Sequence, residues 1–176
     1  MTLNIIKYGS PILRAKSLEV KEGYPIDKDI ESLFNILEKS EGVGLSGVQI
    51  GNLKRLFIID TKRIAEDNPQ VRNIKKAYIN PLIIATGDEL TWFDEGCLSI
   101  PQIYEEIERP EKISVKYQNT LFQTVEEDLI GIEARIFQHE YDHLDGILFI
   151  DRLSPLRKVL LAGKLRKIKT MNRRNR

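Results

Sequence analysis

The chain contains two histidines, and both lie in one short run, His139-Glu-Tyr-Asp-His143. The run matches the pattern H-E-x-x-H and falls within residues 131–144, which we expect to be helical. Side chains four residues apart on a helix share one face, with Cβ atoms about 5–6 Å apart, so both imidazoles can converge on one metal ion. Glu140 can then hydrogen-bond a metal-bound water and take its proton. The pattern predicts a catalytic metal site, and the alternative is two ordinary surface histidines on an amphipathic helix.

A third protein ligand is needed, because catalytic sites of this kind use three ligands and keep one position open. Downstream of Glu140 there is no further glutamate, and Phe149 occupies the place of the third histidine in the metzincin pattern. Asp145 and Asp151 also follow the motif, without a recognisable ligand context. The one thiol, Cys97, is a stronger candidate because thiolates bind metals well, although a lone cysteine is more often a small buried hydrophobic side chain. The glycine before it and the proline four residues after it favour a shaped loop or strand end.

The glycine-rich segment 42–51 contains Gly42-x-Gly44-x-x-Gly47, which matches the dinucleotide-binding pattern by letter. That interpretation requires a strand before the segment, whereas residues 27–40 have the periodicity of a helix. We therefore expect a loop in which glycine allows the backbone to approach a ligand closely. Gln49 could donate an amide N–H to a developing oxyanion, or it is an ordinary surface glutamine.

Hydrophobic periodicity and turn residues place the remaining elements. We expect a buried strand at 56–60, a loop at 61–76, and a strand at 77–86 that Pro81 confines to an edge or a bulge. A hairpin is expected from strands 113–117 and 121–125, a helix end at Asp145-Gly146, and a last helix beginning at Ser154-Pro155. Because strands and helices do not alternate regularly, the fold class is α+β rather than a doubly wound sheet.

Composition limits the classes that need to be considered. With 176 residues, 41% hydrophobic and 30% charged, the chain is expected to form a single domain, 1–176. No apolar run approaches the roughly 18 residues of a membrane span, so we expect no membrane partner. The N-terminal residues lack the pattern of a secretory signal, and one cysteine allows no internal disulfide. A cytoplasmic location is the expectation.

The charges are distributed unevenly. Residues 152–176 hold ten basic side chains and no acidic one, while the other 151 residues hold 17 basic and 26 acidic ones, a net charge of −9. A basic C-terminal helix or tail can contact nucleic acid or another polyanion. It can equally be a solvated helix face.

Three segments together resemble the signature motifs of the peptide deformylase family, in the family's order: Gly42–Gln49, Glu95–Ser99 and Gln138–His143. The start of the chain, Ile5–Leu13, and the pair Arg109-Pro110 are also similar, so the resemblance covers roughly residues 4–155. It implies an α+β fold in which mixed or antiparallel sheets pack around a central helix carrying H-E-x-x-H, with a C-terminal helix. It also implies the removal of the N-formyl group from the initiator N-formylmethionine of nascent proteins, with release of formate.

The resemblance also implies roles for individual residues. Cys97, His139 and His143 would ligate the metal, and Glu140 would be the general base and then the acid. Gln49 and the backbone N–H of Leu98 would bind the oxyanion. The substrate would contact Val43, Gly44, Phe93, Gly96, Ile132 and Ile136, with part of His139 also lining the methionine pocket.

The resemblance implies one divalent metal, Fe²⁺ in the cell, with Zn²⁺, Ni²⁺ or Co²⁺ possible in purified protein. The basic tail is similar in kind to extensions by which some family members reach the ribosome. The chain departs from the family at Ser46-Gly47, where two alanines are usual, at Tyr104, where some members carry arginine, and in the longer segment 61–76.

Two rival functions remain open at this stage. A metalloendopeptidase would need a third ligand downstream of the motif. A metal-dependent or RNA-binding module would use a closed structural site with four protein ligands.

Overall fold

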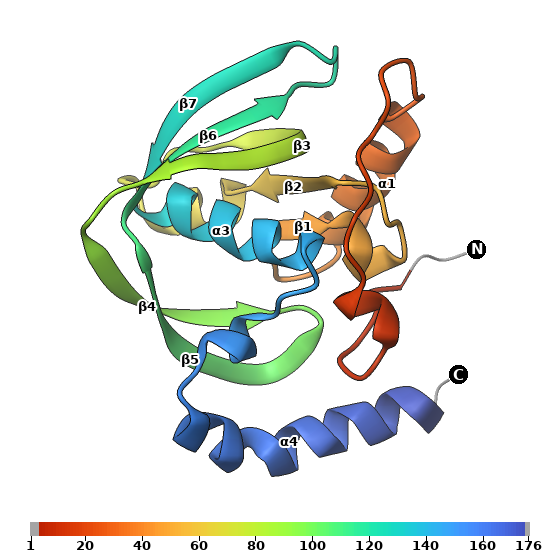
Figure 1. Ribbon diagram of the computed structural model, residues 1–176, viewed down its shortest axis with the longest axis vertical. Coiled ribbons are helices and arrows are strands. Elements are labelled where there is room, and N and C mark those ends of the chain that lie inside the picture. Colours follow the sequence, from red (N-terminus) through yellow and green to blue (C-terminus); the bar gives the residue numbers. More distant parts are fainter. Residues whose placement is uncertain (1–3, 175–176) are drawn as a thin grey trace.

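Helix α3 (Ile132–Leu144) lies between two antiparallel sheets (Figure 1). The structure is a computed structural model that describes residues 4–174; residues 1–3 and 175–176, including Arg176 of the basic segment, lie outside the described residues. The larger sheet has the strand order β1-β2-β3-β6-β7, and the smaller one pairs β4 with β5. This arrangement confirms the predicted α+β fold with antiparallel sheets around the helix that carries H-E-x-x-H.

The large sheet consists of β1 (Gly44–Ser46), β2 (Leu56–Asp60), β3 (Lys75–Thr86), β6 (Lys112–Gln118) and β7 (Thr124–Ile130). The small sheet consists of β4 (Leu90–Cys97) and β5 (Ile100–Pro110). The other helices are α1 (Asp27–Glu38), α2 (Lys62–Asp67) and α4 (Pro155–Arg174). Short 3-10 helices are η1 (Pro11–Arg14), η2 (Gly47–Ile50) and η3 (Phe149–Arg152).

Packing of aromatic rings fixes α3 on the large sheet. The ring of Phe137 meets those of Phe57 and Tyr78 edge-on, with centroids 5.0 and 5.1 Å apart. Such perpendicular pairs add to the stabilisation from apolar burial. Because Phe137 faces this core, His139 and His143 lie on the part of the helix that approaches the end of β4.

The strands β4 and β5 were not predicted from the sequence. Cys97 does lie at the end of β4, which agrees with one of the two expectations for this residue, a shaped loop or a strand end. Along β5, the buried side chains alternate with exposed ones, and the buried set includes Glu105 and Arg109 as well as Ile103 and Ile107. Charged residues at inward positions conceal the alternation that identifies a half-buried strand.

Three other segments differ from expectation. Segment 61–76 contains α2 and the start of β3, and segment 42–51 contains β1 and η2 instead of an open loop. Of the residues expected to form strand 121–125, the first three belong to the connection after β6, so β7 begins only at Thr124. Pro81 lies in a central strand at a register shift, which confirms the bulge and excludes the edge.

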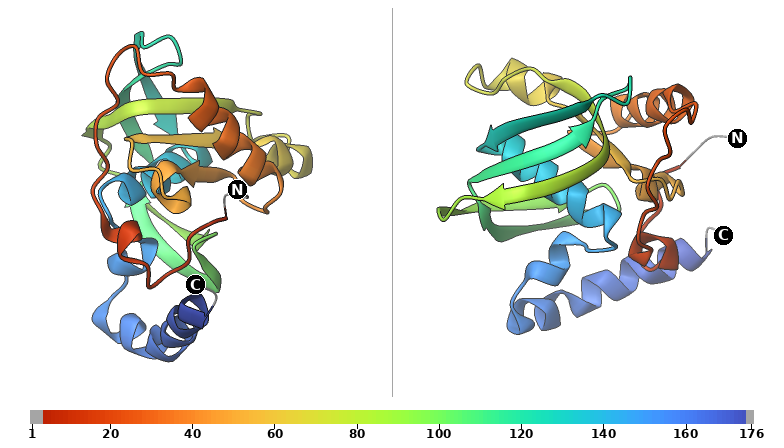
Figure 2. Two further views of the ribbon diagram at one scale, coloured as in Figure 1. Left: turned by 90° about the vertical axis from the view of Figure 1, so that its right-hand side faces the viewer. Right: turned by 45° about the horizontal axis from the view of Figure 1, so that its top comes forward.

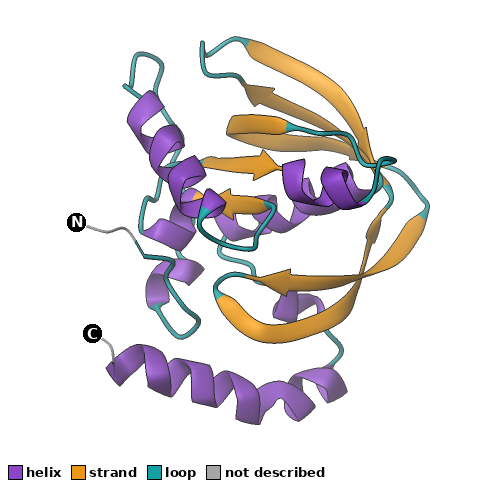
Figure 3. Ribbon diagram, turned by 180° about the vertical axis from the view of Figure 1, so that it is seen from behind, coloured by secondary structure: helices purple, strands orange, loops and turns teal. Residues whose placement is uncertain are grey.

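Helix α4 packs along the outer side of β5 and beside the N-terminal segment (Figures 2 and 3). Leu161, Leu165 and Ile168 contact the core of this region, and the Nδ2 of Asn172 donates to the Lys7 carbonyl at 3.0 Å. The Ser154 hydroxyl accepts the Arg157 N–H at 3.3 Å, which confirms the predicted helix start. In the described residues, no helix is both long enough and apolar enough to cross a membrane.

Substitution of Gly146, the residue that ends α3, should destabilise the fold. Its φ is +72°, and an added Cβ would lie 2.6 Å from the backbone oxygen of Arg14. We expect Gly146→Ala to lower the free energy of unfolding by at least about 2 kcal/mol, as measured by urea denaturation, because it combines left-handed strain with a backbone clash. Gly23→Ala is the control, since Gly23 also has a positive φ but no atom of the described residues outside its immediate neighbours lies within 4 Å of where its Cβ would be. Equal losses in both variants would show that the clash has no effect.

Candidate metal centre

Three side chains that can bind a metal meet between α3 and the end of β4. The sulfur of Cys97 and one nitrogen of each of His139 and His143 all lie within 4.8 Å of one another. The Cys97 Sγ is 3.2 Å from the Nε2 of His143, and the two imidazole centroids are 5.2 Å apart. One thiolate and two imidazoles form a donor set that suits first-row divalent metals. The two surface histidines considered as an alternative are therefore excluded.

The surroundings of Cys97 favour its thiolate. Burial raises the pKa of this thiol, but the nearby His143 and the hydrogen bonds with His139 and His143 outweigh burial and hold the pKa well below its usual range. Burial lowers the pKa of His139, whereas Cys97 and Glu95 outweigh that effect and raise it well above its ordinary value. Because the thiolate is the form that binds metals, Cys97 is prepared for ligation, and metal binding would release the His139 proton.

Glu95 orients the first histidine. Its Oε2 lies 2.8 Å from the Nδ1 of His139, and its two oxygens accept from the Nε and a terminal nitrogen of Arg109 at 2.6 and 2.9 Å. Burial raises the pKa of Glu95, but the hydrogen bonds from His139 and Arg109 outweigh it and hold the pKa far below the ordinary range. The carboxylate therefore binds the Nδ1 proton and leaves Nε2 as the nitrogen that could serve as a ligand, an arrangement common among the outer partners of metal-binding histidines.

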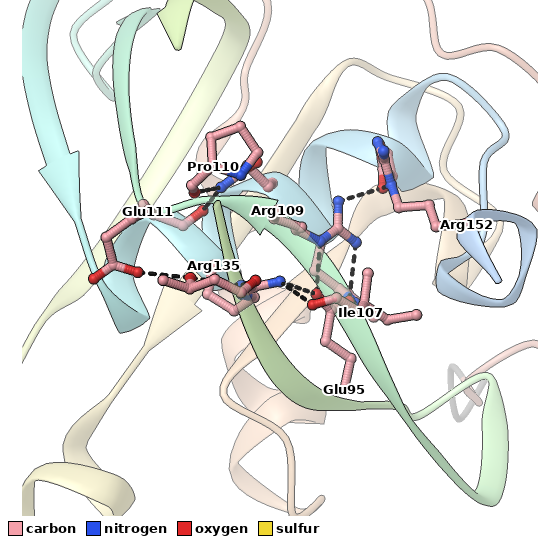
Figure 4. Close-up of polar contacts among 12 residues, drawn as sticks. Glu95, Ile107, Arg109, Pro110, Glu111, Arg135 and Arg152 are labelled. Atoms are coloured by element: carbon pink, nitrogen blue, oxygen red, sulfur yellow. Dashed lines mark hydrogen bonds and ion pairs between the residues drawn. The ribbon is translucent and has the colours of Figure 1, made fainter. Parts of the chain in front are cut away.

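Figure 4 shows that Arg109 and Arg135 both point to Glu95. Arg109 is 2% exposed, and it also donates to Asp142 on α3 at 2.7 Å. Asp142 in turn accepts from Arg152 of η3 at 2.6 Å. These ion pairs join β4, β5, α3 and η3 around the candidate ligands.

Most of this network was not predicted from the sequence. Arg109 was noted there only as part of the Arg-Pro pair, and no role was assigned to Arg135, Asp142 or Arg152. The partners of these residues lie on other elements, so no local pattern in the sequence signals the network.

Glu140 lies beside the three candidate ligands and is 4% exposed. Its Oε2 accepts from the hydroxyl of Ser46 at 2.7 Å. Its Oε1 lies against Gly44, where an added Cβ would be only 2.6 Å from that oxygen. Burial raises the pKa of Glu140, which favours a group that can hold a proton as well as take one.

Gln49 is 1% exposed, so it is not a surface glutamine. Its Oε1 accepts the backbone N–H of Ser46 at 2.8 Å. Its Nε2 therefore points toward the ligand cluster, 3.2 Å from the Ser99 hydroxyl and 3.5 Å from the sulfur of Cys97. An amide donor therefore lies beside the three candidate ligands, which excludes one of the two alternatives that the sequence left open for Gln49.

Leu98 lies in the turn between β4 and β5, and its carbonyl accepts from the Nζ of Lys7 at 2.8 Å. Backbone hydrogen bonds from Ile6 to Gln49 and from Tyr8 to Ser99, 2.7 and 2.8 Å long, hold the same region. Lys7 was not predicted at the site. The N-terminal segment thus ties η2 to the turn that follows Cys97.

A cavity of about 440 Å³ opens beside the ligand cluster. Its lining includes all six residues expected to contact substrate: Val43, Gly44, Phe93, Gly96, Ile132 and Ile136. Tyr104 stands at the rim, with its ring 2.6 Å from where a Cβ on Gly96 would lie. A larger hollow of about 1070 Å³ on the other side of the β4–β5 pair contains none of the three candidate ligands.

Comparisons with known proteins agree with this geometry. The sequence model of the family described as polypeptide deformylase matches residues 2–159. A peptide deformylase from Thermotoga maritima is 43% identical over 159 residues, which cover 90% of this chain and 91% of the relative. One from Christiangramia forsetii is 38% identical, covering 96% and 90%.

Solved structures give the same likeness. Peptide deformylase 1B of Arabidopsis thaliana, in complex with an inhibitor, superposes with a TM-score of 0.86 at 31% identity, covering 98% of this chain and 93% of the other. The Thermotoga maritima enzyme has a TM-score of 0.78 at 41% identity, covering 87% and 98%.

Removal of the Arg109 side chain should destabilise the protein. We expect Arg109→Met to lower the free energy of unfolding by about 3–5 kcal/mol, because it leaves buried carboxylates without their partner. Arg72→Met is the matched control, since Arg72 pairs with Glu133 but its side chain is 67% exposed. That variant should lose no more than about 1 kcal/mol in urea denaturation. Similar losses of unfolding free energy in the two variants would contradict the expectation that a buried ion pair is costlier to break than an exposed one.

The same contacts make stability depend on pH. Because the pKa of Glu95 is lowered in the folded protein, its contribution is present above the ordinary glutamate pKa and lost as the pH falls through the lower folded value. The difference in stability between the wild type and Glu95→Gln should therefore shrink when the urea titration is repeated below about pH 4.

Proposed function

The chain belongs to the polypeptide deformylase family, and on that premise we propose that Cys97, His139 and His143 hold its catalytic metal. The protein is an enzyme that removes the N-formyl group from newly made proteins. The observation that carries the proposal is the meeting of one sulfur and two imidazole nitrogens within 4.8 Å, beside a buried glutamate.

The donor set fits a divalent metal, since thiolate and imidazole are ligands of first-row ions and three protein ligands leave a position open. When bound, such an ion polarises the formyl carbonyl and makes water more acidic. We propose Fe²⁺ as the metal in the cell. Zn²⁺, Ni²⁺ or Co²⁺ could occupy the site in purified protein.

Glu140 is proposed as the group that moves protons. It takes a proton from the attacking water at its carboxylate and then donates it to the amine that leaves. The burial that raises its pKa supports both steps, because a carboxyl with a raised pKa holds the proton long enough to pass it on.

Negative charge that develops on the formyl oxygen would be stabilised by the Nε2 of Gln49 and the backbone N–H of Leu98. Ser46 and Ser99 support this role of Gln49 by fixing the orientation of its amide. Donors that are already oriented in a site sheltered from water stabilise an oxyanion without reorganising during the reaction.

The cavity beside these groups is proposed as the binding site of the formylmethionyl peptide. Phe93, Ile132 and Ile136 offer apolar surface to the methionine side chain. Backbone groups of Val43, Gly44 and Gly96 would hold the peptide as an added strand.

Two rivals have less support. An endopeptidase ligand downstream of the motif is disfavoured because Asp145 pairs with Arg55 at 2.9 Å and Asp151 pairs with Arg14. A closed structural site would need a fourth ligand, and among the described residues the cluster comprises only the three.

We also propose that residues 1–176 form one catalytic domain in the cytoplasm, with 152–176 as its basic C-terminal helix or tail. Packing of α4 against the core through Leu161 supports a single domain. The exposed lysines of α4 support contact between the tail and the ribosome.

Formate release from a formylmethionyl peptide tests the proposed site. In anaerobically purified protein of measured metal content, Gln49→Ala should lower kcat by about 10²–10³ through loss of one oxyanion donor. Glu140→Ala should abolish turnover and keep the metal, whereas Cys97→Ser should lose or exchange it. An unformylated peptide is the control for proteolysis. Turnover that persists in Glu140→Ala would contradict its role, and activity that follows zinc rather than iron content would contradict the proposed metal.

Ribosome co-sedimentation at low salt tests the proposed role of α4. Lys164→Glu combined with Lys167→Glu should weaken binding by about tenfold or more, because both lysines are exposed and each reversal replaces attraction to phosphate by repulsion. Lys28→Glu with Lys39→Glu, two exposed positions at α1, is the matched control. Equal binding by the two double variants would refute the role of the tail.

A further inference from the structure

Ser46 contacts both of the side chains to which the proposed function assigns proton transfer and oxyanion binding. Its backbone N–H donates to the Oε1 of Gln49 at 2.8 Å. Its hydroxyl lies 2.7 Å from the Oε2 of Glu140 and 2.9 Å from the backbone oxygen of the same residue. Ser46 is fully buried, so water does not substitute for these contacts.

We propose that the Ser46 hydroxyl is a positioning group that sets the direction of the Glu140 carboxylate. The inference rests on the proposed role of Glu140 and extends it to the Ser46 hydroxyl, which the proposed function does not use. Ser46 does not itself touch the formyl group in this proposal; it acts only through Glu140.

The geometry explains why a positioning group has an effect here. A glutamate side chain has three rotatable bonds, and its terminal torsion is broad and weakly preferred. Among the described residues, Ser46 is the one side chain that donates a hydrogen bond to the Glu140 carboxylate. Gly44 lies on the Oε1 side and offers no side chain that could fix the group. With Oε2 held by Ser46, Oε1 is the oxygen that remains for the attacking water.

Mutation can separate the backbone contact of Ser46 from the two contacts of its hydroxyl. An alanine at position 46 keeps the backbone N–H that orients Gln49 and loses only the hydroxyl.

Steady-state kinetics on the metal-loaded enzyme test the proposal. We expect Ser46→Ala to lower kcat by about tenfold, the order of effect of a hydrogen bond to a charged group. KM should stay within about twofold, and metal content and melting temperature should be unchanged. The matched control is Ser17→Ala, which removes a buried hydroxyl that has no hydrogen-bond partner among the described residues, and its kcat should equal that of the wild type.

A double-mutant cycle separates positioning of Glu140 from a general structural effect. In a Glu140→Asp background the shortened carboxylate is displaced from the hydroxyl, so Ser46→Ala should cause no further loss of kcat. An equal loss in both backgrounds, a wild-type kcat in Ser46→Ala, or a loss that follows metal content or melting temperature would each overturn the inference. Full turnover in Glu140→Ala would instead overturn the proposed function, so the two failures can be told apart.

Discussion

The buried carboxylate of Glu95 is the group around which the site is assembled. It accepts from Arg109, Arg135 and His139, which come from β5 and α3, while Glu95 itself lies on β4. A buried carboxylate without partners is strongly unfavourable, so the small sheet and the helix are stable only when docked in this arrangement. Cys97 lies two residues further along β4, and docking therefore brings its sulfur to the two histidines. The ion network thus sets the relative position of the three candidate ligands.

Close approach of backbones is the second constraint. Glu140 lies against β1 at Gly44, where any side chain would collide with its carboxylate. At Gly47 an added Cβ would lie 2.8 Å from the carbonyl oxygen of Asn52, so a small residue is required there as well. Because β1 passes this close to α3, Ser46 reaches Glu140 and η2 brings Gln49 to the sulfur of Cys97. The glycine pattern therefore reflects close packing, of Gly44 against α3 and of Gly47 against the backbone before β2, and has no relation to a phosphate-binding loop.

The sequence predicts features that depend on a short segment better than features that depend on contacts between distant segments. Helix α3 and its end at Gly146 were predictable, because apolar periodicity and a left-handed glycine are properties of a short segment. The β4–β5 pair was not predictable, because β5 carries two charges at buried positions, Glu105 and Arg109. Their partners come from other elements and meet them when the chain folds: Arg157 for Glu105, and Glu95 and Asp142 for Arg109. Gln49 could not be assigned to the surface or the interior, since its partners come from β1 and from the turn after β4. Cys97 could be favoured over Asp145 and Asp151 as the third ligand, but the ion pairs that occupy the two aspartates were visible only in the structure.

The N-terminal segment around Lys7 and the C-terminal part of α4 around Asn172 are both connected to the site. Asn172 of α4 binds the carbonyl of Lys7, and the ammonium group of Lys7 binds the carbonyl of Leu98, so two hydrogen bonds connect α4 to the turn that carries a proposed oxyanion donor. Burial lowers the pKa of Lys7, and the nearby Cys97 thiolate opposes that shift, which ties the charge of this lysine to the ligand cluster. Removing the end of α4 would therefore disturb the turn as well as the basic surface. Charge substitutions on the exposed face of α4 leave these two hydrogen bonds in place. Such substitutions can therefore separate the attraction of α4 to a polyanion from its structural support of the site, which truncation of the helix cannot do.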